Sequence, residues 1–155
     1  MRQWLLATTL AFTTVLAVAV QPAEQVEASS PSITGSIQGV EWCPQSVCGT
    51  ANFSGYFSGK VGGWWAWGVW TIYVNYDVLP APGTSVPIWG SWRLSTTRGS
   101  FSGSLSGTLT NNGDNTFSIA ATMTVLVGGS GTISASGLLN HNVFPPTLKG
   151  YLSGP

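Results

Sequence analysis

The chain has 155 residues, a formal net charge of zero at pH 7, and 6% charged against 43% hydrophobic residues. One domain is the expectation at this length, and the hydrophobic content excludes the class of highly charged, weakly hydrophobic disordered chains. The few Lys and Arg residues are scattered, so they cannot neutralise a run of phosphates, and we expect no nucleic-acid partner.

Residues 1–28 have the layout of a secretory signal peptide. A short basic start precedes an uncharged apolar stretch over 4–20, and small residues flank a cleavage point after Ala28. We therefore expect a secreted or periplasmic protein with a mature domain over 29–155 and no membrane span. The alternative is an uncleaved membrane anchor, which the short, threonine-interrupted apolar stretch disfavours.

Cys43 and Cys48 lie in the segment EWCPQSVCG and are the two ends of a six-residue loop. In an exported protein two nearby cysteines most simply form a disulfide, and so short a loop gives about 2 kcal/mol of stabilisation. A structural zinc site needs four Cys or His ligands, whereas the mature domain offers only these two and His141. We expect a disulfide, no metal and no cofactor.

Four segments repeat a seven-residue pattern of apolar, any, Gly, any, apolar, any, Gly, at 33–39, 53–59, 101–107 and 148–154. Because side chains alternate faces along a strand, the pattern puts large residues and glycines on one face and mainly Ser or Thr on the other. Alternation with one wet face is typical of antiparallel sheets, and the glycine density excludes helices. Alternating small and large residues suit the crowded interior of a closed barrel.

Turn-forming segments separate the runs into eight expected strands. Their short connections favour an all-β fold with a single antiparallel up-and-down barrel, and a two-sheet sandwich is the alternative. The expected strands cover 32–41, 50–58, 63–76, 85–95, 99–110, 115–127, 130–139 and 146–153.

A polar group is predicted at one rim of this barrel. The first, third and seventh strands end at the same rim. If the alternation that points every second side chain into the barrel continues to their ends, Glu41, Tyr76 and His141 come together there. Asn115, at the start of the sixth strand, is expected to point inward beside them. A few polar groups above an apolar floor are the usual form of a small-ligand site, although polar residues at strand ends are more often simply solvated.

The segment GWWAWGVW at 63–70 divides between the two faces of the third strand. The phase places Trp64 and Trp70 inward, and it places Trp65 and Trp67 outward on the face that also carries Tyr73. The outward rings need a cover, which is the N-terminal segment, another subunit or a ligand. They therefore predict a saccharide-binding or self-association surface.

Three function classes follow. The first is a secreted, non-catalytic module that binds a small apolar molecule in the barrel mouth or a saccharide on the outer aromatic face. The second is a cell-surface structural protein that self-associates through the face of Trp65 and Trp67. The third is a small barrel isomerase or cyclase with Glu41, Tyr76 or His141 as acid and base, since no G-x-S-x-G nucleophile motif is present.

An outer-membrane barrel is disfavoured. Such barrels place apolar side chains outside and polar ones inside, so the serines of the segment at 101–107 would have to line the lumen and would leave it underfilled.

Overall fold

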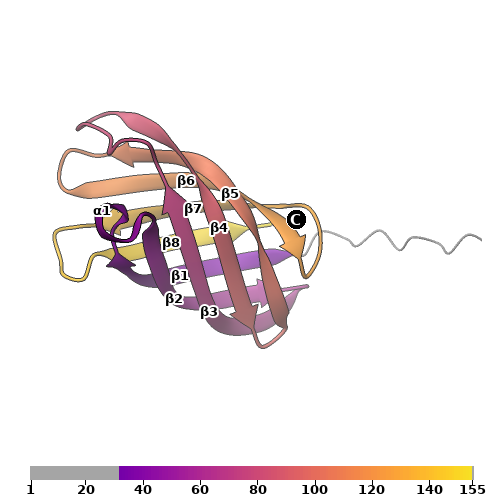
Figure 1. Ribbon diagram of the computed structural model, residues 1–155. Helices are drawn as coiled ribbons and strands as arrows, with labels where there is room; N and C mark the ends of the chain where they lie inside the picture. The colour runs from indigo at the N-terminus through magenta and orange to yellow at the C-terminus, as the bar shows by residue number, and fades with distance from the viewer. Residues whose placement is uncertain (1–31, 155) are drawn as a thin grey trace, which may run out of the picture.

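The computed structural model describes residues 32–154, which form a closed antiparallel barrel of eight strands with one short helix (Figure 1). The predicted signal peptide lies outside the described residues. The strands are β1 (Ile33–Cys43), β2 (Ala51–Val61), β3 (Trp64–Asn75), β4 (Ser85–Thr96), β5 (Gly99–Asn111), β6 (Thr116–Val127), β7 (Thr132–Asn140) and β8 (Thr147–Ser153), and α1 (Gln45–Cys48) joins β1 to β2.

The predicted up-and-down barrel is confirmed. Each strand pairs with the next along the chain, and β8 pairs back with β1 in the register Gln38↔Lys149. That last pairing distinguishes a barrel from the alternative two-sheet sandwich. Each observed strand lies within three residues of its predicted bounds at both ends. The largest extension is at the end of β2, where Val61 continues the ladder opposite Ile33.

The side chains alternate as the repeated segments predicted, between a buried inner face and a solvent-exposed outer face. In β5, Phe101 and Leu105 are buried, whereas Ser104 and Ser106 are exposed. Burial of the apolar inner faces supplies the main driving force for closing the sheet.

Glycines let neighbouring strands approach closely where a tryptophan covers them. Gly39 lies opposite Gly55, which lies opposite the buried Trp70 in the next strand. A Cβ on Gly39 would lie 2.2 Å from the Ser54 carbonyl oxygen and 2.6 Å from the Trp70 ring. The indole N–H of Trp70 donates to the Tyr56 carbonyl oxygen at 2.9 Å, so the buried ring leaves no unpaired donor.

Trp92 repeats this arrangement on the neighbouring strand, β4. It is buried opposite Gly103, and its indole N–H donates to the carbonyl oxygens of Ser104 at 3.0 Å and Thr124 at 3.3 Å. The two indoles, together with Phe57 and Leu94, help to fill the barrel interior.

The prediction that Trp64 lies in the core is wrong, because its side chain is 69% exposed. Trp64 is the first residue of β3. Its cross-strand neighbour Val61 is among the last buried side chains at this end of the barrel. The ring therefore extends past the end of the barrel, where the guanidinium of Arg98 lies 5.9 Å from its centroid.

The two ends of the barrel differ. The mouth is the end at which α1 and the connections β3–β4, β5–β6 and β7–β8 lie. The closed end carries the start of β1, the end of β8 and the other three connections. Backbone bonds from Gly62 to Ser32 and from Gly154 to Ile33 tie the closed end together. Figure 1 shows α1 and the end of β8 at opposite ends of the barrel. Over residues 32–154, no helix is long and apolar enough to cross a membrane.

Candidate functional site

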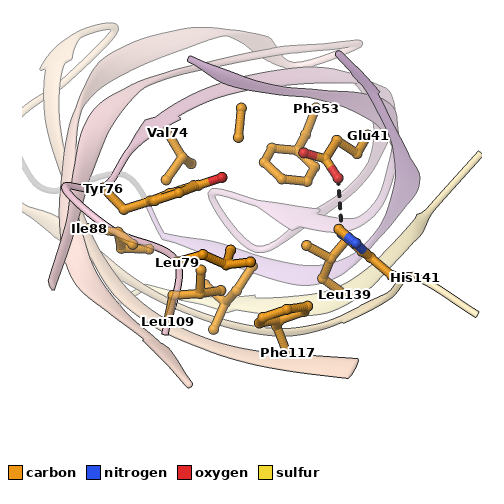
Figure 2. Close-up of a pocket in the computed structure, with 12 residues that line it drawn as sticks. Glu41, Phe53, Val74, Tyr76, Leu79, Ile88, Leu109, Phe117, Leu139 and His141 are labelled. Carbon is orange, nitrogen blue, oxygen red and sulfur yellow. Dashed lines mark ion pairs between the residues drawn. The ribbon is translucent and has the colours of Figure 1, made fainter. Parts of the chain in front are cut away.

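Three of the four predicted rim residues meet at the mouth. Glu41 lies near the end of β1, and Tyr76 and His141 directly follow β3 and β7. The Nε2 atom of His141 lies 3.0 Å from Oε2 of Glu41. Figure 2 shows this pair on one wall of the barrel, with the hydroxyl of Tyr76 pointing towards Glu41 from the other side.

These polar groups stand above an apolar cavity. It offers about 30 Å³ to the centres of water molecules and contains about 400 Å³ of atom-free space, part of which is open to solvent. Leu79, from the β3–β4 connection, is 53% exposed and lies across the opening. The other apolar residues lining the cavity are Ala51, Phe53, Val74, Ile88, Leu109, Phe117, Ile119 and Leu139.

A second apolar cavity lies deeper in the barrel. It offers about 40 Å³ to water centres and shares four lining residues with the first, namely Phe53, Val74, Ile88 and Ile119. Either volume exceeds the roughly 10–15 Å³ that one water centre requires. The walls of the deeper cavity offer almost no hydrogen-bond partners, so that space favours apolar atoms over water. Movement of the shared side chains would join the two cavities into one longer channel.

Glu41 is a carboxyl group in an apolar surrounding. Its side chain is 5% exposed, and burial raises its pKa, while the charge of His141 and the hydrogen bond from it act in the opposite direction. Burial also raises the pKa of Tyr76, and the nearby Glu41 charge raises it further. Both groups are therefore biased towards the protonated state, in which each donates a hydrogen bond.

His141 is held from three sides. Its backbone N–H donates to the Asn115 carbonyl oxygen at 2.9 Å, its ring centroid lies 5.2 Å from that of Phe117, and its Nε2 faces Glu41. The imidazole is 36% exposed, so it is the rim group most open to solvent. Its position lets it exchange protons with both water and the buried carboxyl group.

Asn115 does not point inward as predicted. It lies in the β5–β6 turn with a left-handed φ of 60°, and its exposed side chain donates to Oδ1 of Asn142 at 3.4 Å. The inward phase does not extend to it because the turn rotates the backbone before β6 begins. Its contribution to the site is the carbonyl oxygen that positions His141.

Gln45 is a site residue that the sequence reasoning missed. Its Nε2 donates to the Tyr76 carbonyl oxygen at 2.7 Å, and its Oε1 accepts from the Tyr76 N–H at 3.0 Å. The amide thus substitutes for a strand neighbour at the point where β3 ends. No local pattern signals this contact, because the two residues are 31 positions apart.

The predicted disulfide between Cys43 and Cys48 is confirmed, with the two Cα atoms 6.1 Å apart. It closes the loop that contains Gln45, and so it fixes α1 over the edge of the mouth. Its place in the fold gives it a structural part in the site.

On the outer face of β3, Trp65 and Trp67 are each 72% exposed and Tyr73 is 40% exposed. A shallow hollow beside Trp65 is lined by Lys60 from β2 and Tyr151 from β8. The Lys60 ammonium lies 5.8 Å from the centroid of the Trp65 ring. This face is separated from the mouth cavity by the wall of the barrel.

Comparison of the chain with protein-family models, with curated proteins and with solved structures found no match.

Proposed function

We propose that this protein binds a small, largely apolar molecule in the barrel mouth. The observation that carries the proposal is the uneven filling of the barrel: large side chains pack the interior towards the closed end, whereas two adjacent apolar cavities lie beneath the rim. An apolar cavity with a few converging polar groups is the usual form of a small-ligand site.

The rim groups define one end of the ligand. Protonated Glu41 and Tyr76 donate hydrogen bonds, and a deprotonated Glu41 accepts them, so the ligand carries a hydroxyl, carbonyl or amine at the end that faces the mouth. The rest of the ligand is hydrocarbon, because the cavity walls below the rim are apolar. Leu79 must move for the ligand to enter, since it lies across the opening.

A neutral hydrophobic dye, N-phenyl-1-naphthylamine, tests the proposal. We expect saturable binding to one site with enhanced dye fluorescence. Ile119 lines both cavities, so the larger ring of Ile119→Phe should occupy part of their space and weaken binding by about tenfold or more. The matched control is Leu138→Phe, which adds the same ring on the outer face of β7, where Leu138 is 47% exposed.

Equal dye affinity in these two variants would show that the dye does not occupy the cavity, provided that both keep the circular dichroism of the parent. A second, dye-independent measurement is organic extraction and mass spectrometry of the protein purified from its host. The absence of both saturable dye binding and an extracted apolar compound would refute the proposal.

The Glu41–His141 contact supports a second candidate, an acid–base enzyme of the isomerase or cyclase type. A buried carboxyl group paired with a solvent-accessible imidazole can take a proton from a bound ligand and return one to it. Incubating an extracted ligand in heavy water with the parent and with Glu41→Gln distinguishes the two functions. Exchange of ligand hydrogen for deuterium by the parent alone indicates catalysis, and unchanged ligand indicates binding.

A further inference from the structure

The closed end carries large apolar side chains exposed to water on two of its strands, β3 and β6. The closed-end cluster consists of Trp64, Trp65 and Trp67 at the start of β3 and of Leu126 and Val127 at the end of β6, with exposed fractions of 69%, 72%, 72%, 66% and 61%. Exposed groups of this size mark interaction surfaces, because covering them removes apolar surface from water.

Cations border this cluster. The Lys60 ammonium lies 5.8 Å from the centre of the Trp65 ring, and the Arg98 guanidinium lies 5.9 Å from that of Trp64. The Arg98 side chain also donates to the Trp65 carbonyl oxygen at 3.5 Å. In the described part of the chain, the acidic residues Glu41, Asp77 and Asp114 all lie at the mouth. The closed end is therefore cationic and the mouth is acidic.

We propose that the closed end docks on the surface of an anionic lipid bilayer. Tryptophan rings lie preferentially at the level of the lipid headgroups, since they combine an apolar body with one hydrogen-bond donor. Lys and Arg beside them are attracted to anionic headgroups, and exposed leucine and valine side chains at the same end of the barrel reach the acyl boundary. The closed-end cluster combines these three kinds of side chain.

The path of the chain supports the same orientation. β1 starts at the closed end, as the bond from Gly62 to the Ser32 carbonyl oxygen shows. The sequence before it, with the apolar stretch 4–20, therefore joins the barrel at this end. A chain that retained this stretch as an anchor would be tethered to the bilayer from the same end of the barrel.

The mouth also exposes apolar residues, including Phe144 at 98% and Val78 at 64%. The exposed carboxylates of Asp77 and Asp114 at the mouth nevertheless oppose contact with an anionic surface, whereas Lys60 and Arg98 at the closed end favour it. Charge therefore distinguishes the two ends where apolar exposure alone does not.

Docking is tested on the protein purified from its host, with vesicles of phosphatidylcholine that contain either no phosphatidylglycerol or about a third of it. An environment-sensitive fluorophore on Thr97→Cys reports the closed end, and one on Asn112→Cys reports the mouth. With anionic vesicles we expect a blue shift of the first label and none of the second. This comparison holds whether or not the N-terminal segment is retained.

Variants separate the contributions of the rings and the charges. Trp65→Ser combined with Trp67→Ser should weaken partition into anionic vesicles by about tenfold or more, against less than about twofold for Trp42→Ser near the mouth. Lys60→Gln should weaken it by about fivefold, and the control Lys149→Gln, away from the closed end, by less. Raising the salt from about 0.1 M to about 1 M should weaken the binding of the parent.

Several results would overturn the proposal: an equal or larger blue shift at the mouth, no shift at either label, or equal partition of the ring variant and Trp42→Ser. Saturable binding of an acidic glycan without vesicle binding would instead assign Trp65 and Trp67 to a saccharide site. Concentration-dependent dimerisation that is lost in the ring variant, again without vesicle binding, would assign them to self-association. Retained near-ultraviolet circular dichroism in each variant establishes that the fold is intact.

Discussion

Replacing His141 by alanine should destabilise the barrel near neutral pH by about 1–3 kcal/mol. The substitution removes the Nε2 atom 3.0 Å from Glu41, whose side chain is 5% exposed, and leaves the carboxylate without its partner. A buried polar group that loses its partner bears its own desolvation cost, which is of this size or larger for a charged group. Because the imidazole is partly exposed, the loss of its own buried surface adds little to this cost.

The expected cost depends on pH in a defined direction. Burial raises the pKa of Glu41 above its ordinary value of 4.5, so the folded state binds this proton more tightly than the unfolded state. The resulting stability is fully present below about pH 4.5 and is lost as the pH rises through the folded-state pKa. Each unit by which that pKa is raised corresponds to about 1.4 kcal/mol. Removing His141 raises the pKa of Glu41 further, so this loss becomes larger and extends to higher pH.

Urea unfolding followed by tryptophan fluorescence measures the effect, at about pH 4 and near neutral pH, in the parent and in a Glu41→Gln background. In that background residue 41 cannot form a carboxylate, so the part of the stability loss at rising pH that Glu41 causes should be absent. His141→Ala should then cost less than about 0.5 kcal/mol. An equal cost of His141→Ala in both backgrounds, or at both pH values, would refute the reasoning.

The same unfolding assay checks three further predictions. Trp92→Phe removes the indole donor from two partly buried carbonyl oxygens and should cost about 1–3 kcal/mol, whereas Trp89→Phe, at a 44% exposed position, should cost less than about 0.5 kcal/mol. Gly39→Ala should cost about 1–3 kcal/mol, since its Cβ would lie 2.2 Å from a carbonyl oxygen, and Gly137→Ala less, since its nearest contact is a leucine methyl at 3.1 Å. Gln45→Ala removes two hydrogen bonds and should cost about 1–3 kcal/mol.

The strands could be predicted from the sequence because their rule is local. Alternation of side chains along a strand sorts residues into two faces, and in β5 Leu105 and Ser106 lie on the faces that the alternation gives them. Glycine alternating with large residues on the inner face also indicated closure. The pairing of Gly39 with Gly55 shows why: the backbones come so close that a side chain there would collide.

The same rule predicted the meeting of Glu41, Tyr76 and His141, because each follows its strand's inward phase to the mouth or next to it. It failed where the strand ends. Asn115 lies in a turn with positive φ, so its side chain leaves the phase. Trp64 keeps the inward phase but lies beyond the last buried layer, because alternation gives a side chain's face and says nothing of its depth along the barrel.

A barrel held to a bilayer by its closed end would turn its mouth towards water. A ligand would then reach Glu41 and Tyr76 from the aqueous side, rather than by lateral transfer from the lipid, because the packed interior near Trp70 and Trp92 blocks a path from the other end. Such a ligand needs enough polarity to exist in water and enough hydrocarbon to fill the cavity. An apolar molecule with a hydrogen-bonding group on one end meets both requirements. Its polar end matches the rim residues and its hydrocarbon matches the apolar walls.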